Sequence, residues 1–154
     1  EYASEGVVLA VGLGSTHDTA RRTHLFNETQ AEGFDFPPIV HPQAFVASEA
    51  VVGEGAQVMA GAVIQPGTRV GENVIVNTSA SVDHDCDIQG HVHVAPGVTV
   101  SGGVILGEGV HVGTGASIIE EIEVGEQSTI GAGAVVIHDV PPETTVVGAP
   151  AHAK

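Results

Sequence analysis

A histidine and an aspartate stand side by side at positions 84 and 85 of the chain. Imidazole has an ordinary pKa that suits a general base at neutral pH, and an adjacent carboxylate orients the ring and stabilises its charged form. A glycine N–H nearby would polarise a carbonyl group on which negative charge develops. Together these groups suit acyl transfer from a thioester to an amine or a hydroxyl. On spacing alone, His84 could also be a polar turn residue among the solvated carboxylates of Asp83, Asp85 and Asp87.

His84 lies in a segment whose sequence repeats every six residues. From Val40 to Val136 every sixth residue is aliphatic, which gives seventeen hexads in one phase. The position two residues earlier is mostly small or β-branched, as at Ala80 and Cys86. A fixed six-residue period is typical of a parallel β-helix, whose narrow interior is filled by stacked small side chains. We therefore predict an all-β domain over residues 38–154, a left-handed parallel β-helix of about six coils with a C-terminal capping tail.

Three hexads per coil would place residues 18 apart above one another. The stacking neighbours of His84 would then be Pro66 and Gly102, and a histidine above a glycine has open space and a backbone N–H beside it. Glycines also recur directly after the inward aliphatic residue at multiples of 18, where we expect the chain to turn with positive φ. These are Gly53, Gly71, Gly107 and Gly125.

The first 37 residues have a different composition. Every Phe and Tyr of the chain lies within the first 45 residues. Residues 7–12 are typical of a buried strand, and a helix is expected from about Thr16 to Glu32. Ser15 and Asp18 resemble a capping box, and Gly33 a C-terminal stop. One strand and one helix predict part of a small α/β (Rossmann-like) domain in residues 1–37.

Charge and cysteine content limit the function classes. With 19 acidic and 4 basic residues the formal net charge is −15, and no basic patch is available to hold phosphates. Nucleic acids and anionic membranes are therefore not expected as partners. The sequence shows neither a transmembrane run nor a signal peptide, and its single cysteine, Cys86, fits a core position in a reducing compartment. We expect a cytoplasmic protein.

Several runs of residues resemble one known family. They are Asn77-Thr-Ser-Ala-Ser-Val-Asp-His-Asp-Cys86, His93-Val-Ala-Pro-Gly97, Ser101-Gly-Gly-Val104, Ile130-Gly-Ala-Gly-Ala-Val-Val136 and Val147-Gly-Ala-Pro-Ala151. Over residues 38–153 the chain is similar to the hexapeptide-repeat acyltransferases of the sialic acid O-acetyltransferase and nucleotide-amino-sugar N-acetyltransferase type. The combination of Asn-Thr with His-Asp-Cys is more diagnostic than the hexads, which indicate only the fold.

The resemblance implies a homotrimer with active sites in clefts between neighbouring subunits, and acetyl-CoA lying along each cleft. It implies that His84 is the general base toward the sugar amine and that Asp85 supports it. The N–H of Gly102 would meet the thioester carbonyl. Asn77 and His93 match residues that line the same pocket.

Further residues are assigned by the same resemblance. Gly113 and Ala132 would let the pantetheine arm approach the backbone, and the tail around Pro150 would close the far end of the cleft. In the N-terminal part, Gly12 and Gly14 match a loop that approaches the nucleotide. Arg21 and Arg22 could neutralise its phosphates. No metal is expected.

Alternative functions remain open at this point. The acceptor could be a sugar hydroxyl, as in the sialic acid type, in place of the amino group of a nucleotide-linked amino sugar. A zinc enzyme like the γ-class carbonic anhydrases, which hold zinc between subunits, would need three imidazoles to converge, and His84, His93 and His111 are the candidates. In a non-catalytic β-helix subunit, loss of His84 would change nothing.

Overall fold

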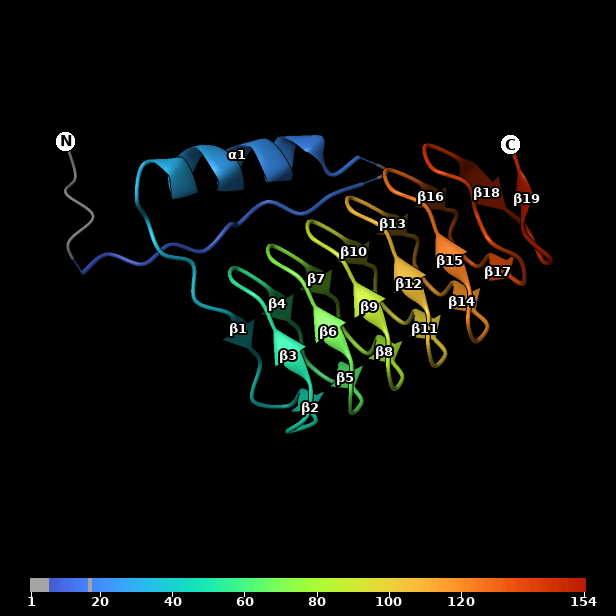
Figure 1. Cartoon of the computed structure of the whole chain (residues 1–154), viewed down its shortest axis with the longest axis horizontal. Coiled ribbons are helices and arrows are strands. Elements are labelled where there is room, and N and C mark those ends of the chain that lie inside the picture. The colour runs from blue at the N-terminus through green and yellow to red at the C-terminus, as the bar shows by residue number, and fades with distance from the viewer. Residues whose placement is uncertain (1–5, 17) are drawn as a thin grey trace.

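The hexad segment forms a parallel solenoid of about six coils with three two-residue strands in each coil (Figure 1). The structure is a computed structural model that describes residues 6–16 and 18–154. All seventeen strands from β1 to β17 end on the aliphatic residue that the hexad pattern marks. The six-residue period therefore predicts the position of every strand from β1 to β17.

Strands one coil apart stack into three sheets. Sheet I consists of β1 (Ile39–Val40), β4 (Gln57–Val58), β7 (Ile75–Val76), β10 (His93–Val94), β13 (His111–Val112), β16 (Thr129–Ile130), β18 (Thr145–Val147) and β19 (His152–Ala153). Sheet II consists of β2 (Phe45–Val46), β5 (Val63–Ile64), β8 (Ser81–Val82), β11 (Thr99–Val100), β14 (Ser117–Ile118) and β17 (Val135–Val136). Sheet III consists of β3 (Val51–Val52), β6 (Arg69–Val70), β9 (Asp87–Ile88), β12 (Ile105–Leu106) and β15 (Glu123–Val124).

The register confirms the predicted spacing of 18 residues per coil. His93 pairs with His111, and Val82 pairs with Val100. Only the last coil is shorter, because Ile130 pairs with Val146, 16 residues ahead. The chain then closes the C-terminal end with an antiparallel pair of strands, β18 and β19.

The interior is the column of small and aliphatic side chains that the pattern predicts. Val82, Ile88 and Val100 are almost fully buried, as is the thiol of Cys86. Burial raises the pKa of Cys86, which confirms a core thiol over a reactive one.

The corners turn at a different residue from the one we predicted. In every hexad from Val52 to Ile130 the positive φ falls three residues after the inward aliphatic, for example at Gly67 and Asp85. Gly53 and Gly71 do not have positive φ, so that expectation was wrong. A Cβ on Gly53 would lie 2.7 Å from the carbonyl carbon of Gly71. These glycines are needed because consecutive coils approach closely there.

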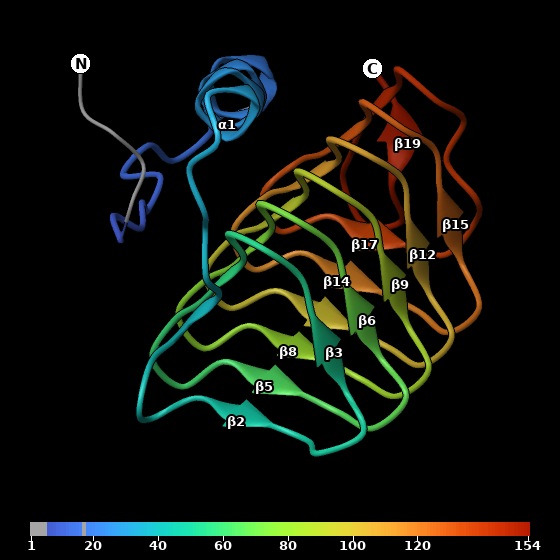
Figure 2. The same cartoon turned by 60° about the vertical axis from the view of Figure 1, so that its left-hand side comes forward.

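The N-terminal part contains one α-helix, α1 (Ala20–Ala31), which lies along the solenoid (Figures 1 and 2). The helix begins four residues later than predicted, and the capping box is wrong because the Ser15 hydroxyl contacts His93 in sheet I. Gly33 is confirmed as the stop, with φ of +88°. Among the described residues no helix has the length and apolar character that a membrane span needs.

The predicted strand at residues 7–12 is reduced to a single bridge between Val8 and Asp35. The Val8 side chain is exposed because no sheet lies over it, whereas Val11 packs with Phe26 and Phe36. A partial Rossmann-like domain in residues 1–37 stays a prediction.

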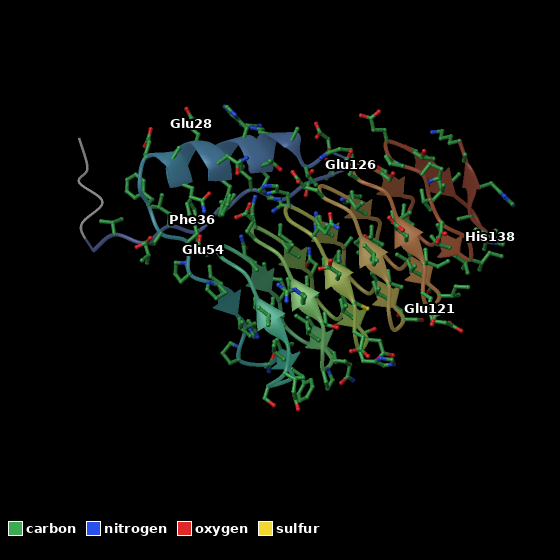
Figure 3. All side chains as sticks on the ribbon, viewed as in Figure 1. Glu28, Phe36, Glu54, Glu121, Glu126 and His138 are labelled. Atoms are coloured by element: carbon green, nitrogen blue, oxygen red, sulfur yellow. The ribbon has the colours of Figure 1, made fainter. Side chains whose placement is uncertain are left out.

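Helix α1 packs on the stacked corners between sheets III and I, a column that contains Gly55, Asn73, His91 and Gly109. The ring of Phe26 covers Gly55, where a Cβ would lie 2.6 Å from the Phe26 Cε2 atom. Phe26 also packs against Phe36, with ring centroids 4.7 Å apart, and Figure 3 shows Phe36 close to Glu54 of that column. Further along the helix, the buried guanidinium of Arg22 donates to the carbonyls of Asn73 and His91.

Candidate active site

The His84–Asp85 pair lies at the corner between sheets II and III, where β8 ends and β9 begins. The Nδ1 atom of His84 is 2.9 Å from Oδ2 of Asp85, and both side chains are exposed. The left-handed φ of Asp85, +57°, is the corner conformation that brings its carboxylate back to the preceding residue. Because a carboxylate only accepts, Nδ1 carries the proton and Nε2 presents its lone pair.

Two glycines from adjacent coils make room for this pair. A Cβ on Gly102 would lie 2.8 Å from Nε2 of His84, and a Cβ on Gly67 would lie 2.3 Å from Oδ1 of Asp85. The ring therefore lies over the Gly102 backbone, as predicted from the 18-residue spacing. Gly67 was missed by sequence reasoning, although the same spacing pairs it with Asp85.

The environment of His84 raises its pKa. The largest cause is the hydrogen bond to Asp85, followed by the negative charge of Asp83. A raised pKa makes Nε2 a stronger proton acceptor.

The backbone beside the ring offers a donor. The ladder between coils uses the N–H groups of Ser101 and Gly103, whereas the N–H of Gly102 meets no backbone carbonyl among the described residues. His84, Asp85, Gly102 and Glu121 line an open hollow of about 430 Å³. Figure 3 shows Glu121 on the side of the solenoid away from helix α1.

A second hollow contains all four residues assigned to the substrate. Gly12 and Gly14, from the N-terminal segment, face His93 of sheet I and Asn77, which directly follows β7, across a space of about 200 Å³. The segment is held there by Gln57, whose Nε2 donates to the carbonyl of Val11 at 2.8 Å. The structure thus brings together residues that are 81 positions apart in the sequence at most.

A third hollow, of about 350 Å³, lies further along sheet I and shares His93 with the second. Its lining includes Gly113 and Ala132, two of the residues assigned to the pantetheine arm. A Cβ on Gly113 would lie 2.6 Å from the Ala132 backbone N, so only glycine allows the coils to approach there. Pro150 belongs to neither hollow and lies exposed between β18 and β19.

Ser15 also lines the third hollow, and sequence reasoning assigned it to the helix cap instead. Its Oγ is 2.8 Å from Nδ1 of His93, whose Nε2 is 3.3 Å from Nδ2 of Asn77. Desolvation by burial is the main cause that lowers the pKa of His93 to about 4, with smaller effects from His111 and Arg22. His93 is therefore neutral at pH 7.

The structure does not bring all the predicted residues to one place. Asn77 and His84 lie at opposite ends of β8, on two different corners of the coil. The Arg22 side chain is buried between helix α1 and the solenoid, so its interpretation as a phosphate ligand is wrong. The side chain of Arg21 is exposed. Figure 2 shows helix α1 to one side of the triangular coil.

Within one chain, the same geometry does not form a zinc site. His93 and His111 do stack, with ring centroids 5.1 Å apart. His84 is at another corner, so the three imidazoles of one chain do not converge. Within residues 6–16 and 18–154, no three His, Cys, Asp or Glu side chains group as metal ligands would.

Solved structures with high similarity to this chain are acetyltransferases. Residues 49–84 match the family model described as bacterial transferase hexapeptide (six repeats). The acetyltransferase domain of PglB from Neisseria gonorrhoeae FA1090 matches with a TM-score of 0.95 and 38% identity, covering 99% of this chain and 73% of that one. That domain has also been solved in complex with acetyl coenzyme A. A histidine-to-alanine mutant of GDP-perosamine N-acetyltransferase from Caulobacter crescentus, in complex with CoA and GDP-perosamine, matches with a TM-score of 0.92 and 34% identity, covering 97% and 70%.

Curated relatives give the same picture over a shorter length. GDP-perosamine N-acetyltransferase from Escherichia coli O157:H7 is 34% identical over 111 residues, covering 72% of this chain and 42% of that protein. Serine acetyltransferase from Buchnera aphidicola subsp. Acyrthosiphon pisum (strain APS) is 30% identical over 120 residues, covering 76% and 38%. The chain thus spans less than half the length of these two relatives.

Proposed function

Because the chain belongs to the hexapeptide-repeat acyltransferase family that includes the sugar N-acetyltransferases, we propose that it acetylates the amino group of a nucleotide-linked amino sugar. Acetyl-CoA is the acetyl donor. The observation that carries the proposal is the His84–Asp85 pair, which leaves the Nε2 lone pair free beside the Gly102 N–H. Four of the similar structures hold acetyl coenzyme A or CoA, and three of these also hold GDP-perosamine.

In the proposed reaction, Nε2 of His84 takes a proton from the acceptor amine as its nitrogen attacks the thioester carbonyl. A C–N bond forms, and the C–S bond then breaks. The departing CoA sulfur receives the proton from the imidazolium. Asp85 holds the ring in the Nδ1–H form throughout, and the Gly102 N–H stabilises the negative charge that develops on the carbonyl oxygen.

The separation of the two corners supports a site shared between copies. The His84–Asp85 pair, called the dyad below, lies at the corner between sheets II and III. The binding hollow lies on sheet I, so the two face different directions on one protomer. A second copy that sets its hollow against the dyad completes the site. We therefore propose a homotrimer of left-handed solenoids, acting in the cytoplasm, with residues 1–37 as part of a sugar-nucleotide-binding α/β domain.

A hydroxyl acceptor is the second candidate, because relatives of this chain include serine acetyltransferases. The chemistry differs only in the atom that attacks the thioester. Sugar O-acetylation of the sialic acid type belongs to the same class.

The proposal is tested by measuring CoA release from acetyl-CoA with a panel of acceptors. The panel consists of UDP- and GDP-linked 4-amino sugars, the same sugar nucleotides with a 4-hydroxyl, and serine. We expect acceptor-dependent release with one or more 4-amino sugars. Release with only hydroxyl acceptors would establish the second candidate, and a protein that does not bind acetyl-CoA would contradict both.

A further inference from the structure

We infer that Ser15 is a hydrogen-bond donor to the substrate in the third hollow, with its direction set by a chain of hydrogen bonds that starts at the Thr78 backbone. This inference rests on the proposed function and adds a residue from the N-terminal segment to the binding site. The chain runs from Thr78 through Asn77 and His93 to Ser15.

The first link fixes the orientation of the Asn77 side chain. The backbone N–H of Thr78 is 2.8 Å from Oδ1 of Asn77, and a backbone N–H can only donate. The Asn77 amide therefore directs its NH₂ group toward His93, with 3.3 Å between Nδ2 and Nε2. Since that NH₂ group only donates, Nε2 of His93 accepts and carries no proton.

The second link fixes the proton on His93. Burial keeps this imidazole neutral at pH 7, with its pKa lowered to about 4. A neutral ring has a single N–H, which must then be on Nδ1. Nδ1 is 2.8 Å from the hydroxyl oxygen of Ser15, which therefore accepts this hydrogen bond.

The Ser15 hydroxyl still has its own hydrogen to donate. His93 is the one side chain to which its oxygen is hydrogen-bonded among the residues that the structure describes. Ser15 is buried in the protein but lines the hollow of about 350 Å³. Its O–H is thus aimed at whatever occupies that space.

The lining of the hollow selects the chemistry of the acceptor atom. Neither Lys nor Arg is among the residues that line it, and of its two imidazoles, His93 and His111, the one bonded to Ser15 is the neutral His93. A phosphate would find no Lys or Arg there, whereas an uncharged oxygen needs only the hydroxyl donor. This oxygen is supplied either by an amide carbonyl of the pantetheine arm, beside Gly113 and Ala132, or by a hydroxyl of the acceptor sugar.

Two variants test the inference in different ways. Ser15→Ala removes the donor. Asn77→Asp reverses the chain, because a carboxylate only accepts, so that the His93 proton moves to Nε2 and Ser15 must donate to Nδ1. The proton positions are read from the ¹⁵N chemical shifts of the His93 ring at pH 8. We expect the Nδ1–H form in the wild type and the Nε2–H form in Asn77→Asp.

Binding of acetyl-CoA and of a GDP-linked 4-amino sugar is then measured by calorimetry for both variants and the double variant. Ser15→Ala should weaken one ligand about 3- to 10-fold, the range for one hydrogen bond, and should have no added effect in the Asn77→Asp background. The ligand affected identifies the source of the oxygen. Ser48→Ala, an exposed serine on another part of the solenoid, is the control.

Three results would overturn the inference. They are an Nε2–H ring in the wild type, unchanged binding of both ligands in Ser15→Ala, or equal effects of Ser15→Ala in the two backgrounds. Failure of the proposed function has a separate signature, because the wild type itself would then bind neither ligand, and the inference would fall with it.

Discussion

At the scale of single residues, the proposed chemistry depends on how Asp85 sets the state of His84. The carboxylate holds Nδ1 and raises the pKa of the ring. The base acts in its neutral form, so activity should rise with pH through the pKa of His84. Asp85→Asn should move this acidic limb of kcat/KM to lower pH and reduce the plateau about 10-fold, because the ring loses basicity and orientation.

The measurement is the pH profile of kcat/KM for the wild type, Asp85→Asn and Asp87→Asn. Asp87 is the nearby carboxylate on β9 that makes no contact with the ring and serves as the control. An acidic limb that stays in place when Asp85 is replaced would show that His84 is not the titrating base.

Part of this residue chemistry was readable from the sequence and part was not. The 18-residue spacing predicts that Gly102 lies beside His84, because both are in the regular repeat. Ser15 lies outside the repeat, and its contact with His93 depends on the path of the N-terminal segment over sheet I. That path is determined by side-chain packing, and the six-residue repeat contains no information about it.

At the scale of elements, α1 is attached to the solenoid by a small number of buried contacts. Arg22 donates to the carbonyls of Asn73 and His91 from inside the interface, and burial lowers its pKa to about 10, so that it remains charged at pH 7. Arg22→Met keeps most of the apolar stem but removes both hydrogen bonds. We expect the attachment of α1 to weaken by about 3 kcal/mol, the order of magnitude for hydrogen bonds from a charged donor.

Hydrogen exchange measures this effect separately for each element. Amides of α1 should lose protection in Arg22→Met, while those of β8 and β11 should keep it, because these strands belong to sheet II and Arg22 contacts the corner between sheets III and I. Arg21→Met is a matched control, since Arg21 is the neighbouring residue on the same helix and is exposed. Equal protection of α1 in both variants would contradict this role of Arg22.

The elements of the repeat were predictable because one physical requirement, a narrow filled interior, recurs seventeen times. The N-terminal helix was found with its end at Gly33 but with the wrong start. Asp18 lies before the N-cap residue, Thr19, and its Oδ1 accepts from the N–H of Ala20 at 2.7 Å, whereas Ser15 is used for a tertiary contact. Rules for helix capping consider only residues that are neighbours in the sequence, so they do not predict that a tertiary contact uses the Ser15 hydroxyl.

At the scale of the whole molecule, the dyad and the hollow that we propose as two halves of one site point in different directions on one protomer. The dyad is at the corner where β8 ends, and the hollows that contain His93 lie under the N-terminal segment on sheet I. The central claim is that His84 of one copy acts as the base on a substrate held in the hollow of the next copy. Symmetric assemblies with a head-to-tail interface provide this arrangement three times in a ring.

Mixing two inactive variants tests that claim most directly. His84→Ala alone should lower kcat by about 10²- to 10⁴-fold while acetyl-CoA still binds, as expected for loss of a general base. His93→Ala should also be inactive, because it alters the hollow in which the substrate is held. When the two are unfolded, mixed in equal amounts and refolded together, about one quarter of the sites should combine an intact dyad with an intact hollow, and the rate should recover to about one quarter of the wild-type value. Activity that stays at the level of the separate variants would contradict a site shared between copies, and a full rate for His84→Ala alone would contradict the role of His84 itself.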